Sequence, residues 1–398
     1  MTAKSMMPYV EGNSAIRAMF EEGARLAAKY GKENVYDFSL GNPSVPAPPE
    51  VDQAIRDILA EEDTLYVHGY NQSNSGYEDV RTVVADHINK LHGTSFTSAN
   101  IVMTVGAASG LNVAIKTFLD PGDEILAFAP YFVEYGNYAK NHGVELRAVP
   151  ANTKDFQPNL DKLAEMITEK THAVIINSPN NPTGVIYSAE TLTALASVLE
   201  AAAERIGHEI YIISDEPYRE LAFDGAVVPY VTKFYRNTIV GYSWSKSLSL
   251  PGERIGYLVI PSEIDDFENA ISAANIANRV LGYVNAPTLI QRVAARCIDC
   301  TTDLAAYDRN RVALYEGLVS LGYECTKPEG AFYLFVKSPI DDDVEFCALA
   351  KKYNILAVPG KSFACPGYIR LAYCVSYDTI VNSLPAWGKL MEEIRASK

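Results

Sequence analysis

Short apolar runs separated by amphipathic segments recur along most of the chain. The runs cover residues 101–105, 124–129, 172–177, 209–214, 238–242 and 255–260. Helical periodicity lies between several of them, at about residues 108–118 and 132–141 and most clearly at 192–205. Strands that are apolar on both faces and separated by helices are typical of parallel sheets covered by helices on both sides. The pattern therefore predicts an α/β fold built on a mainly parallel sheet.

The pattern changes towards both ends of the chain. A proline-rich stretch, residues 43–49, separates a short N-terminal segment from the alternating region. From about residue 299 a long helix is expected to lead into a C-terminal α+β segment. Cys297 and Cys300 form a lone Cys-x-x-Cys pair, which we expect inside a helix as reduced, buried thiols. A chain of 398 residues is long enough for at least two domains.

Composition narrows the choice of partners. The formal charge is −15 and no basic run of five or more residues occurs, so neither nucleic acid nor an anionic membrane is expected to bind. Residues 1–20 lack the apolar core of a signal peptide, and no window approaches 18 uncharged apolar residues. A cytoplasmic location is therefore expected. The six histidines are scattered without metal-binding spacing, so no metal site is predicted.

Residues able to carry chemistry follow four of the apolar runs. These residues are Gly106, Asn181, Asp215 and Lys246. In open α/β sheets, ligands bind beyond the carboxyl ends of the strands. We therefore expect these four positions to meet at one edge of the sheet and to form a ligand site there.

Lys246 is the centre of the candidate chemistry. It ends a Ser-Trp-Ser-Lys sequence, and Arg254 follows it by eight residues. Asp215 opens an Asp-Glu-Pro-Tyr sequence, Asn181 lies in Asn-Asn-Pro-Thr-Gly, and Arg370 lies far downstream. This set suits a lysine Schiff base with an anionic, pyridine-containing aldehyde. Each motif alone also has a structural interpretation: a surface lysine, an ion pair, a helix cap or a turn.

Together, the order and spacing of these motifs resemble those of class I/II aminotransferases, which are fold-type I enzymes dependent on pyridoxal phosphate (PLP). The resemblance runs from Leu40 to Leu371. It implies a large domain with a mainly parallel seven-stranded sheet between helices, and a smaller α+β domain built from both termini. The implied boundaries are 1–50 for an N-terminal arm and part of the small domain, 51–295 for the large PLP-binding domain and 296–398 for the C-terminal small domain.

The resemblance implies a role for each catalytic candidate. Lys246 would form the Schiff base with PLP and carry the proton between Cα and C4′. Asp215 would keep the pyridine nitrogen protonated, and Tyr218 and Asn181 would reach the phenolic oxygen of the cofactor. The peptide bonds Asn181–Pro182 and Ala129–Pro130 are expected to be cis.

The remaining cofactor contacts concern the phosphate and the ring. The implied phosphate ligands are the turn at Gly106, the amides of Ala107 and Ala108, and the side chains of Ser243 and Arg254. Phe132 aligns with the aromatic residue that stacks on the cofactor ring, although core packing is the common fate of a phenylalanine.

Substrate binding and assembly follow from the same resemblance. Arg370 would bind the substrate α-carboxylate, helped by the backbone of Gly41 and by Asn181. Tyr70, or alternatively Tyr66, matches a tyrosine that contacts the phosphate of the neighbouring subunit. The resemblance therefore predicts a two-fold homodimer with active sites between the subunits.

Two other functions share these motifs. A PLP-dependent lyase, such as a carbon–sulfur β-lyase or a cyclopropane-forming synthase, uses the same cofactor residues, and a non-catalytic PLP-binding regulator is a third hypothesis. Leu281 occupies the place of the arginine that binds a second carboxylate in dicarboxylate-specific relatives, and Arg279 is displaced by two residues. This place disfavours aspartate as the donor unless the geometry of the loop brings Arg279 into reach. Leu281, Tyr283 and Tyr333 are instead candidates for an apolar or aromatic-tolerant substrate pocket, with core packing as the alternative.

Overall fold

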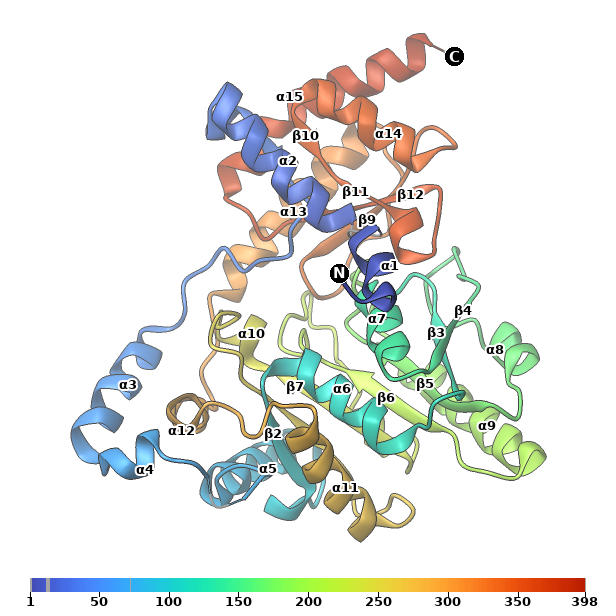
Figure 1. Cartoon of the computed structure of the whole chain (residues 1–398). Helices are drawn as coiled ribbons and strands as arrows, with labels where there is room; N and C mark the ends of the chain where they lie inside the picture. Colours follow the sequence, from blue (N-terminus) through green and yellow to red (C-terminus); the bar gives the residue numbers. More distant parts are fainter. Residues whose placement is uncertain (1, 12–14, 72, 398) are drawn as a thin grey trace.

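A central sheet organises the computed structural model, which describes residues 2–11, 15–71 and 73–397 (Figure 1). Its strands are β2 Ile101–Thr104, β3 Glu124–Phe128, β4 Glu145–Val149, β5 Thr171–Asn177, β6 Tyr211–Asp215, β7 Thr238–Ser243 and β8 Gly256–Val259. The seven strands lie in the order β2-β8-β7-β6-β5-β3-β4. Only β8 runs against its neighbours β2 and β7. The predicted seven-stranded, mainly parallel sheet is confirmed.

Helices cover both faces of this sheet because successive strand residues point to opposite sides. On β2, Val102 belongs to a core formed with α6 and α11, whereas Met103 belongs to a core formed with α3, α5 and α12. Ile239 and Val240 on β7 are divided between the same two cores. The helices concerned are α3 Pro49–Glu61, α5 Glu78–His92, α6 Gly106–Phe118, α11 Phe267–Val280 and α12 Thr288–Arg296.

A second body lies above the sheet in Figure 1. Its sheet is antiparallel, in the order β11-β12-β9, with strands β9 Tyr333–Lys337, β11 Val358–Pro359 and β12 Tyr368–Ala372. Its helices are α13 Leu304–Ser320, α14 Asp343–Ala350 and α15 Tyr377–Ala396. The N-terminal strand β1, Tyr36–Asp37, pairs in parallel with β10, Ile355–Leu356. Segments from the N-terminal and C-terminal parts of the chain therefore pair in this body.

The other helices connect or extend these layers. They are α1 Met7–Glu11, α2 Ala15–Tyr30, α4 Thr64–His68, α7 Glu134–Asn141, α8 Leu160–Met166, α9 Ala189–Ile206 and α10 Trp244–Ser247. Among the described residues, no helix is long and apolar enough to cross a membrane.

Most expected elements have ends within two or three residues of those observed, and the exceptions lie near residue 300. Helix α12 ends at Arg296, so the prediction that Cys297 and Cys300 lie inside a helix is wrong. The long helix α13 begins at Leu304 rather than near residue 299, because the Asp303 carboxylate accepts the Ala306 N–H and caps it there. Both expected cis peptide bonds are present, and Ser178–Pro179 is a third.

Candidate active site

The carboxyl ends of β5, β6 and β7 bring the predicted residues together. Asp215 ends β6 and lies opposite Asn177 of β5 and Gly241 of β7. The Asn177 amide donates to the Asp215 carbonyl at 2.7 Å, and its own oxygen accepts the Asn181 N–H at 2.6 Å. Asn177 therefore joins two predicted site residues. Sequence reasoning missed it, because a polar residue at a strand end is ordinarily a turn residue.

Asp215 is a buried carboxylate that is half satisfied. Its Oδ2 accepts a hydrogen bond from the Tyr135 hydroxyl at 2.6 Å, whereas Oδ1 is buried and has no hydrogen-bond partner among the described residues. Burial raises the pKa of Asp215 to about 7, against the lowering effect of the Tyr135 hydrogen bond. Tyr135 was not predicted; the only signal was its position one helical turn after Phe132. The free oxygen suits a cationic N–H donor.

Lys246 lies on the short helix α10, with its amine inside the site. Nζ donates to the Gly41 carbonyl at 2.9 Å and lies 5.1 Å from the centre of the Phe332 ring. Burial is the main reason that its pKa falls from 10.5 to about 8; Arg254 and Arg370 lower it further, while Cys374 and Asp215 raise it. At neutral pH about a tenth of such amines are uncharged, which a nucleophilic lysine requires.

Arg370 projects from β12 into the same space. Its side chain is buried, donates to the Asn181 side-chain oxygen at 3.2 Å and to the Ser39 carbonyl, and lies over the Tyr333 ring. Nε is buried and has no hydrogen-bond partner among the described residues. A buried guanidinium with donor capacity to spare suits bidentate binding of a carboxylate.

Tyr333 lies at the centre of these groups. Its hydroxyl is 3.1 Å from that of Tyr218, and its ring faces the Arg370 guanidinium. A Cβ at Gly41 would lie 1.9 Å from the Tyr333 hydroxyl oxygen, so only glycine fits where the chain passes Lys246. The structure therefore gathers Gly41, Tyr218 and Arg370 around one side chain, and Lys246 is bonded to the Gly41 carbonyl.

An anion cradle lies beside this cluster. Helix α6 begins at Gly106, whose φ of 79° favours glycine, and a Cβ there would come within 2.8 Å of the Arg254 guanidinium. The first amides of the helix, at Ala107 and Ala108, are therefore next to a cation. In the β7–β8 pair Ser243 lies opposite Gly256, and Gly256 follows Arg254 by two residues. A helix N-terminus with an adjacent arginine is suited to a phosphate group.

Phe132 and the two tyrosine candidates lie at the margin of this arrangement. Phe132 is half-buried and packs edge-on against Tyr135 at a centroid distance of 5.6 Å. Tyr70 is 90% exposed. Tyr66 instead packs on the Tyr77 ring at 4.8 Å, with the Arg292 guanidinium 4.1 Å from its own ring centre. In this single chain Tyr66 is thus held by its own subunit, whereas Tyr70 projects outward. Within the described part of the chain, no group of three or more His, Cys, Asp or Glu side chains is placed to hold a metal ion.

The chain is similar in sequence to known aminotransferases. The model of the aminotransferase class I and II family matches residues 33–383. The aspartate/prephenate aminotransferase of Thermus thermophilus is 30% identical over 362 residues, which cover 89% of this chain and 90% of that protein.

Solved structures extend the similarity to the fold. An amino transferase from Eubacterium rectale has 46% sequence identity and a TM-score of 0.96, with 99% of each chain covered. The aspartate aminotransferase of Thermus thermophilus with maleate has 26% identity and a TM-score of 0.85, covering 98% of this chain and 100% of that one. These relatives do not support the lyase or the regulator hypothesis. The chain belongs to the aminotransferase class I and II family.

Proposed function

We propose that this aminotransferase depends on PLP, with Lys246 as the residue that binds it, and that it moves an amino group from an L-amino acid to a 2-oxo acid in two half-reactions. The observation that carries the proposal is the Lys246 amine, which lies against the Gly41 carbonyl with a pKa lowered to about 8. An imine-forming lysine needs an amine that is shielded from solvent and whose pKa lies near neutral pH.

The residues present fit the cofactor. The unpaired Oδ1 of Asp215 is an acceptor for a protonated ring nitrogen, and the cradle of Gly106, Ala107, Ala108, Ser243 and Arg254 suits a phosphate. Tyr218 and Asn181 supply donors for the phenolic oxygen, and Phe132 supplies an aromatic face.

The chain's own groups divide the work. PLP, when bound, supplies an aldehyde that takes up the amino group and a ring that accepts the electrons of the Cα–H bond. The Lys246 amine would take the Cα proton and give it to C4′, the former aldehyde carbon of the cofactor. Asp215 holds a proton on the ring nitrogen, because an ionised carboxylate next to it favours the charged form. Arg370 grips the α-carboxylate and so orients Cα for the transfer.

We propose that the pocket for the substrate side chain favours an amino-acid donor without a second charge. Tyr138, Leu281 and Tyr283 pack as half-buried residues against the core of α6 and α11, together with Phe132. Arg279, the nearest arginine in sequence, is exposed. We therefore expect the kcat/KM for phenylalanine, tyrosine or methionine to exceed that for aspartate; a higher value for aspartate would show that a second cation reaches the pocket.

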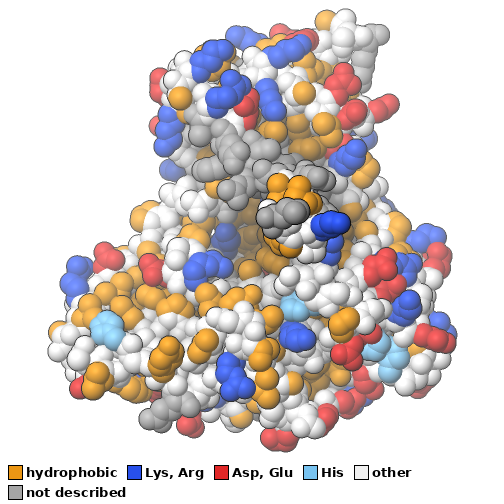
Figure 2. Space-filling view, viewed as in Figure 1, with side chains coloured by type: hydrophobic (Ala, Val, Ile, Leu, Met, Phe, Trp, Pro, Cys, Tyr) orange, Lys and Arg blue, Asp and Glu red, His pale blue; other side chains and the backbone are white. Residues whose placement is uncertain are grey.

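We also propose a homodimer in which Tyr70 completes the phosphate site of the partner. Figure 2 shows apolar side chains gathered over the region where Figure 1 places α3 and α4. In the sequence of this region, Leu59 of α3, Leu65 and Tyr66 of α4, and Tyr70, two residues beyond α4, are exposed. An exposed apolar patch of this kind is typical of an interface.

Mixing two inactive variants tests this assembly. Lys246→Ala lacks the amine, and Tyr70→Phe lacks the hydroxyl. A mixed dimer has one site with Lys246 from one subunit and Tyr70 from the other, so mixing should restore activity that neither variant has. Tyr66→Phe is the control: it should be active without mixing, because Tyr66 packs against Tyr77 and Arg292 of its own chain. No recovery with Tyr70→Phe would show that Tyr70 serves its own subunit or none.

The same division into domains is part of the proposal: 1–50, 51–295 and 296–398. One buried cluster joins Phe38 to the core of α13 and α15 and also includes Tyr218, Leu221 and Phe223 from the loop after β6. Separate clusters fill the two faces of the large sheet, which supports a distinct large domain.

The visible spectrum is the direct test of the function. With PLP, the protein should show an absorption band that Lys246→Ala lacks. The band should convert when an amino acid is added alone and return when a 2-oxo acid follows. A band that does not form would refute the Lys246 assignment, and one that forms but does not return with any 2-oxo acid would refute the amino-transfer proposal.

A further inference from the structure

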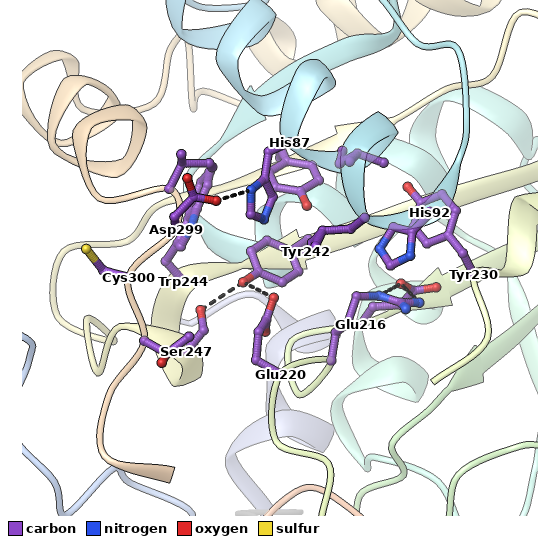
Figure 3. Close-up of a pocket in the computed structure, with 16 residues that line it drawn as sticks. His87, His92, Glu216, Glu220, Tyr230, Tyr242, Trp244, Ser247, Asp299 and Cys300 are labelled. Atoms are coloured by element: carbon purple, nitrogen blue, oxygen red, sulfur yellow. Dashed lines mark hydrogen bonds and ion pairs between the residues drawn. The ribbon is translucent and has the colours of Figure 1, made fainter. Parts of the chain in front are cut away.

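A chain of three hydrogen-bonded side chains lies behind the lysine helix. The Tyr242 hydroxyl donates to Oε1 of Glu220 at 2.8 Å and lies 2.8 Å from the Ser247 hydroxyl. Figure 3 shows the Tyr242 hydroxyl between these two groups. Burial raises the pKa of Tyr242 well above its ordinary value, so the phenol keeps its proton. Because that proton goes to Glu220, Ser247 must donate to Tyr242, so the two hydrogen bonds run in one direction, from Ser247 through Tyr242 to Glu220.

The three residues flank the proposed chemistry without belonging to it. Tyr242 immediately precedes Ser243, Ser247 immediately follows Lys246, and Glu220 lies two residues beyond Tyr218. The two hydrogen bonds therefore connect three elements: β7, which leads into α10, the helix α10 itself and the loop that carries Tyr218.

Helix α10 needs such an anchor. It spans only Trp244–Ser247, and a single turn is not stable without tertiary contacts. Its terminal backbone hydrogen bonds are long: Leu248 N–H to Trp244 O is 3.3 Å and Ser249 N–H to Lys246 O is 3.3 Å. Residue 249 also has a φ of 53°, so the helix cannot be extended in regular form. At its first residue the helix is held by Trp244, which packs on the Tyr242 and Tyr257 rings and donates its N–H to the Ile255 carbonyl at 3.3 Å. At its last residue, next to Lys246, it is held through Ser247.

Packing behind α10 is incomplete. A cavity of about 260 Å³ is lined by Trp244 and Ser247 of this helix, by Tyr242, and by Glu220 from the Tyr218 loop (Figure 3). Side chains that border a cavity have fewer dispersion contacts than those in a close-packed core. Two hydrogen bonds remain at Ser247: its carbonyl accepts the Thr302 N–H at 2.7 Å, and its hydroxyl is bonded to Tyr242.

The other titratable groups that line the cavity have partners of their own: His87 lies 3.1 Å from Asp299, and His92 stacks on Tyr230. Arg219 pairs with Glu216 and also donates to the Val228 and Pro229 carbonyls. The far oxygen of Glu220, Oε2, is buried with no hydrogen-bond partner among the described residues. Glu220 is therefore engaged through Tyr242 at one oxygen, and replacing that carboxylate by an amide keeps the acceptor that Tyr242 uses.

We propose that Tyr242 is a positioning residue for Lys246, which it holds in place through Ser247 while Glu220 orients its hydroxyl. The inference rests on the proposed function, because it concerns the placement of the amine that binds the cofactor. It predicts that loss of the Tyr242 hydroxyl displaces the amine without altering the grip of Arg370 on the substrate. The turnover number should then suffer more than the substrate KM.

Three variants test the hydrogen-bonded side chains: Tyr242→Phe, Ser247→Ala and Glu220→Gln. Tyr235→Phe is the matched control. Tyr235 is another buried tyrosine of the large sheet region, and its hydroxyl donates to the Ile210 carbonyl at 2.7 Å. We expect Tyr242→Phe and Ser247→Ala to lower kcat between about tenfold and a hundredfold, the range that small misplacement of a catalytic group causes, with KM changed less than about threefold. Glu220→Gln should stay close to wild type.

A readout separate from turnover is the pH titration of the visible band of the PLP-loaded protein. We expect its midpoint to move by at least about half a pH unit in Tyr242→Phe, because the environment of the lysine nitrogen changes, and to stay unchanged in Tyr235→Phe. The double variant Tyr242→Phe/Ser247→Ala should lose no more than the worse single variant. Equal losses of thermal stability in Tyr242→Phe and Tyr235→Phe, with kcat and titration midpoint unchanged in both, would overturn the proposal.

The outcomes also separate this proposal from the function on which it rests. If Tyr242→Phe fails to fold, Ser247→Ala still decides: unaltered kcat and titration midpoint there would overturn the positioning role. A wild-type protein that shows the band and transfers amino groups supports the proposed function whatever the variants do. A wild-type protein without the band would refute the function first.

Discussion

Replacing Asp215 by asparagine should stabilise the cofactor-free protein while it destroys the site. The side chain is only 5% exposed and Oδ1 has no partner among the described residues, so its ionised form is costly. Asparagine has nearly the same shape and carries no charge. Its oxygen can still accept the Tyr135 hydroxyl, which in the wild type lies 2.6 Å from Oδ2.

The size of the effect follows from the pKa. Burial raises the Asp215 pKa from 3.8 to about 7. Between these values the folded protein holds a proton that the unfolded chain has lost, so the free energy of unfolding of the wild type falls as the pH rises. At about 1.4 kcal/mol per pH unit, the whole loss is about 4 kcal/mol, and about 3 kcal/mol of it falls between pH 5 and pH 8.

Denaturant unfolding of cofactor-free wild type and Asp215→Asn at pH 5 and pH 8 measures this difference. We expect the advantage of the variant to grow by about 3 kcal/mol between the two pH values. With saturating PLP the order should reverse at pH 8, because the wild-type carboxylate then has a cationic partner that asparagine cannot match. A difference that does not change with pH would refute the reasoning, since it would show that Asp215 carries no buried charge.

Three further predictions concern single residues. Lys246→Met should remove a pH dependence of the opposite sense, because the lowered pKa of about 8 makes the Lys246 ammonium costly in the folded, cofactor-free wild type. As the pH rises from 8 to 10.5, the free energy of unfolding of the wild type should increase by up to about 3 kcal/mol relative to the variant, measured by denaturant unfolding. Arg370→Lys should lower kcat/KM at least about a hundredfold by losing bidentate contact, with the absorption band intact; a loss shared by the band would show that Arg370 supports the cofactor instead. Gly106→Ala should weaken PLP affinity at least about tenfold in a spectroscopic titration, because φ is 79° and the new Cβ would press on Arg254; Gly207→Ala, with φ of 84° but open space around the Cβ, separates this clash from backbone strain.

Much of the architecture could be predicted from local pattern. The apolar runs on β2 and β7 indicated strands buried on both sides, and the structure divides Val102 from Met103 and Ile239 from Val240 between two cores. The helix ends near residue 300 could not be placed in this way. There the decisive group is the Asp303 carboxylate, and the sequence offers other acidic residues that would cap a helix equally well.

The candidate site likewise contains residues that the sequence predicted and residues that it did not. Lys246, Asp215, Asn181, Arg254 and Arg370 were predicted from a set of side chains that suits a lysine Schiff base, and their separate roles from the resemblance of their motifs to those of class I/II aminotransferases. Tyr135 and Asn177 were missed. Each acts through a hydrogen bond to another element, at 2.6 Å to Asp215 and at 2.6 Å to the Asn181 N–H, and neither contact is local in the sequence.

The sequence by itself therefore determined the α/β class, and it indicated the strand ends and the types of side chain proposed to carry the chemistry, since these depend on periodicity and on residues close together in the chain. Only the tertiary structure decided how the groups act on one another. The pKa values of Lys246 and Asp215 depend on burial, and the contact of Arg370 with Asn181 depends on packing between β12 and the loop after β5. Burial and distance arise when remote segments pack, so no local pattern contains them.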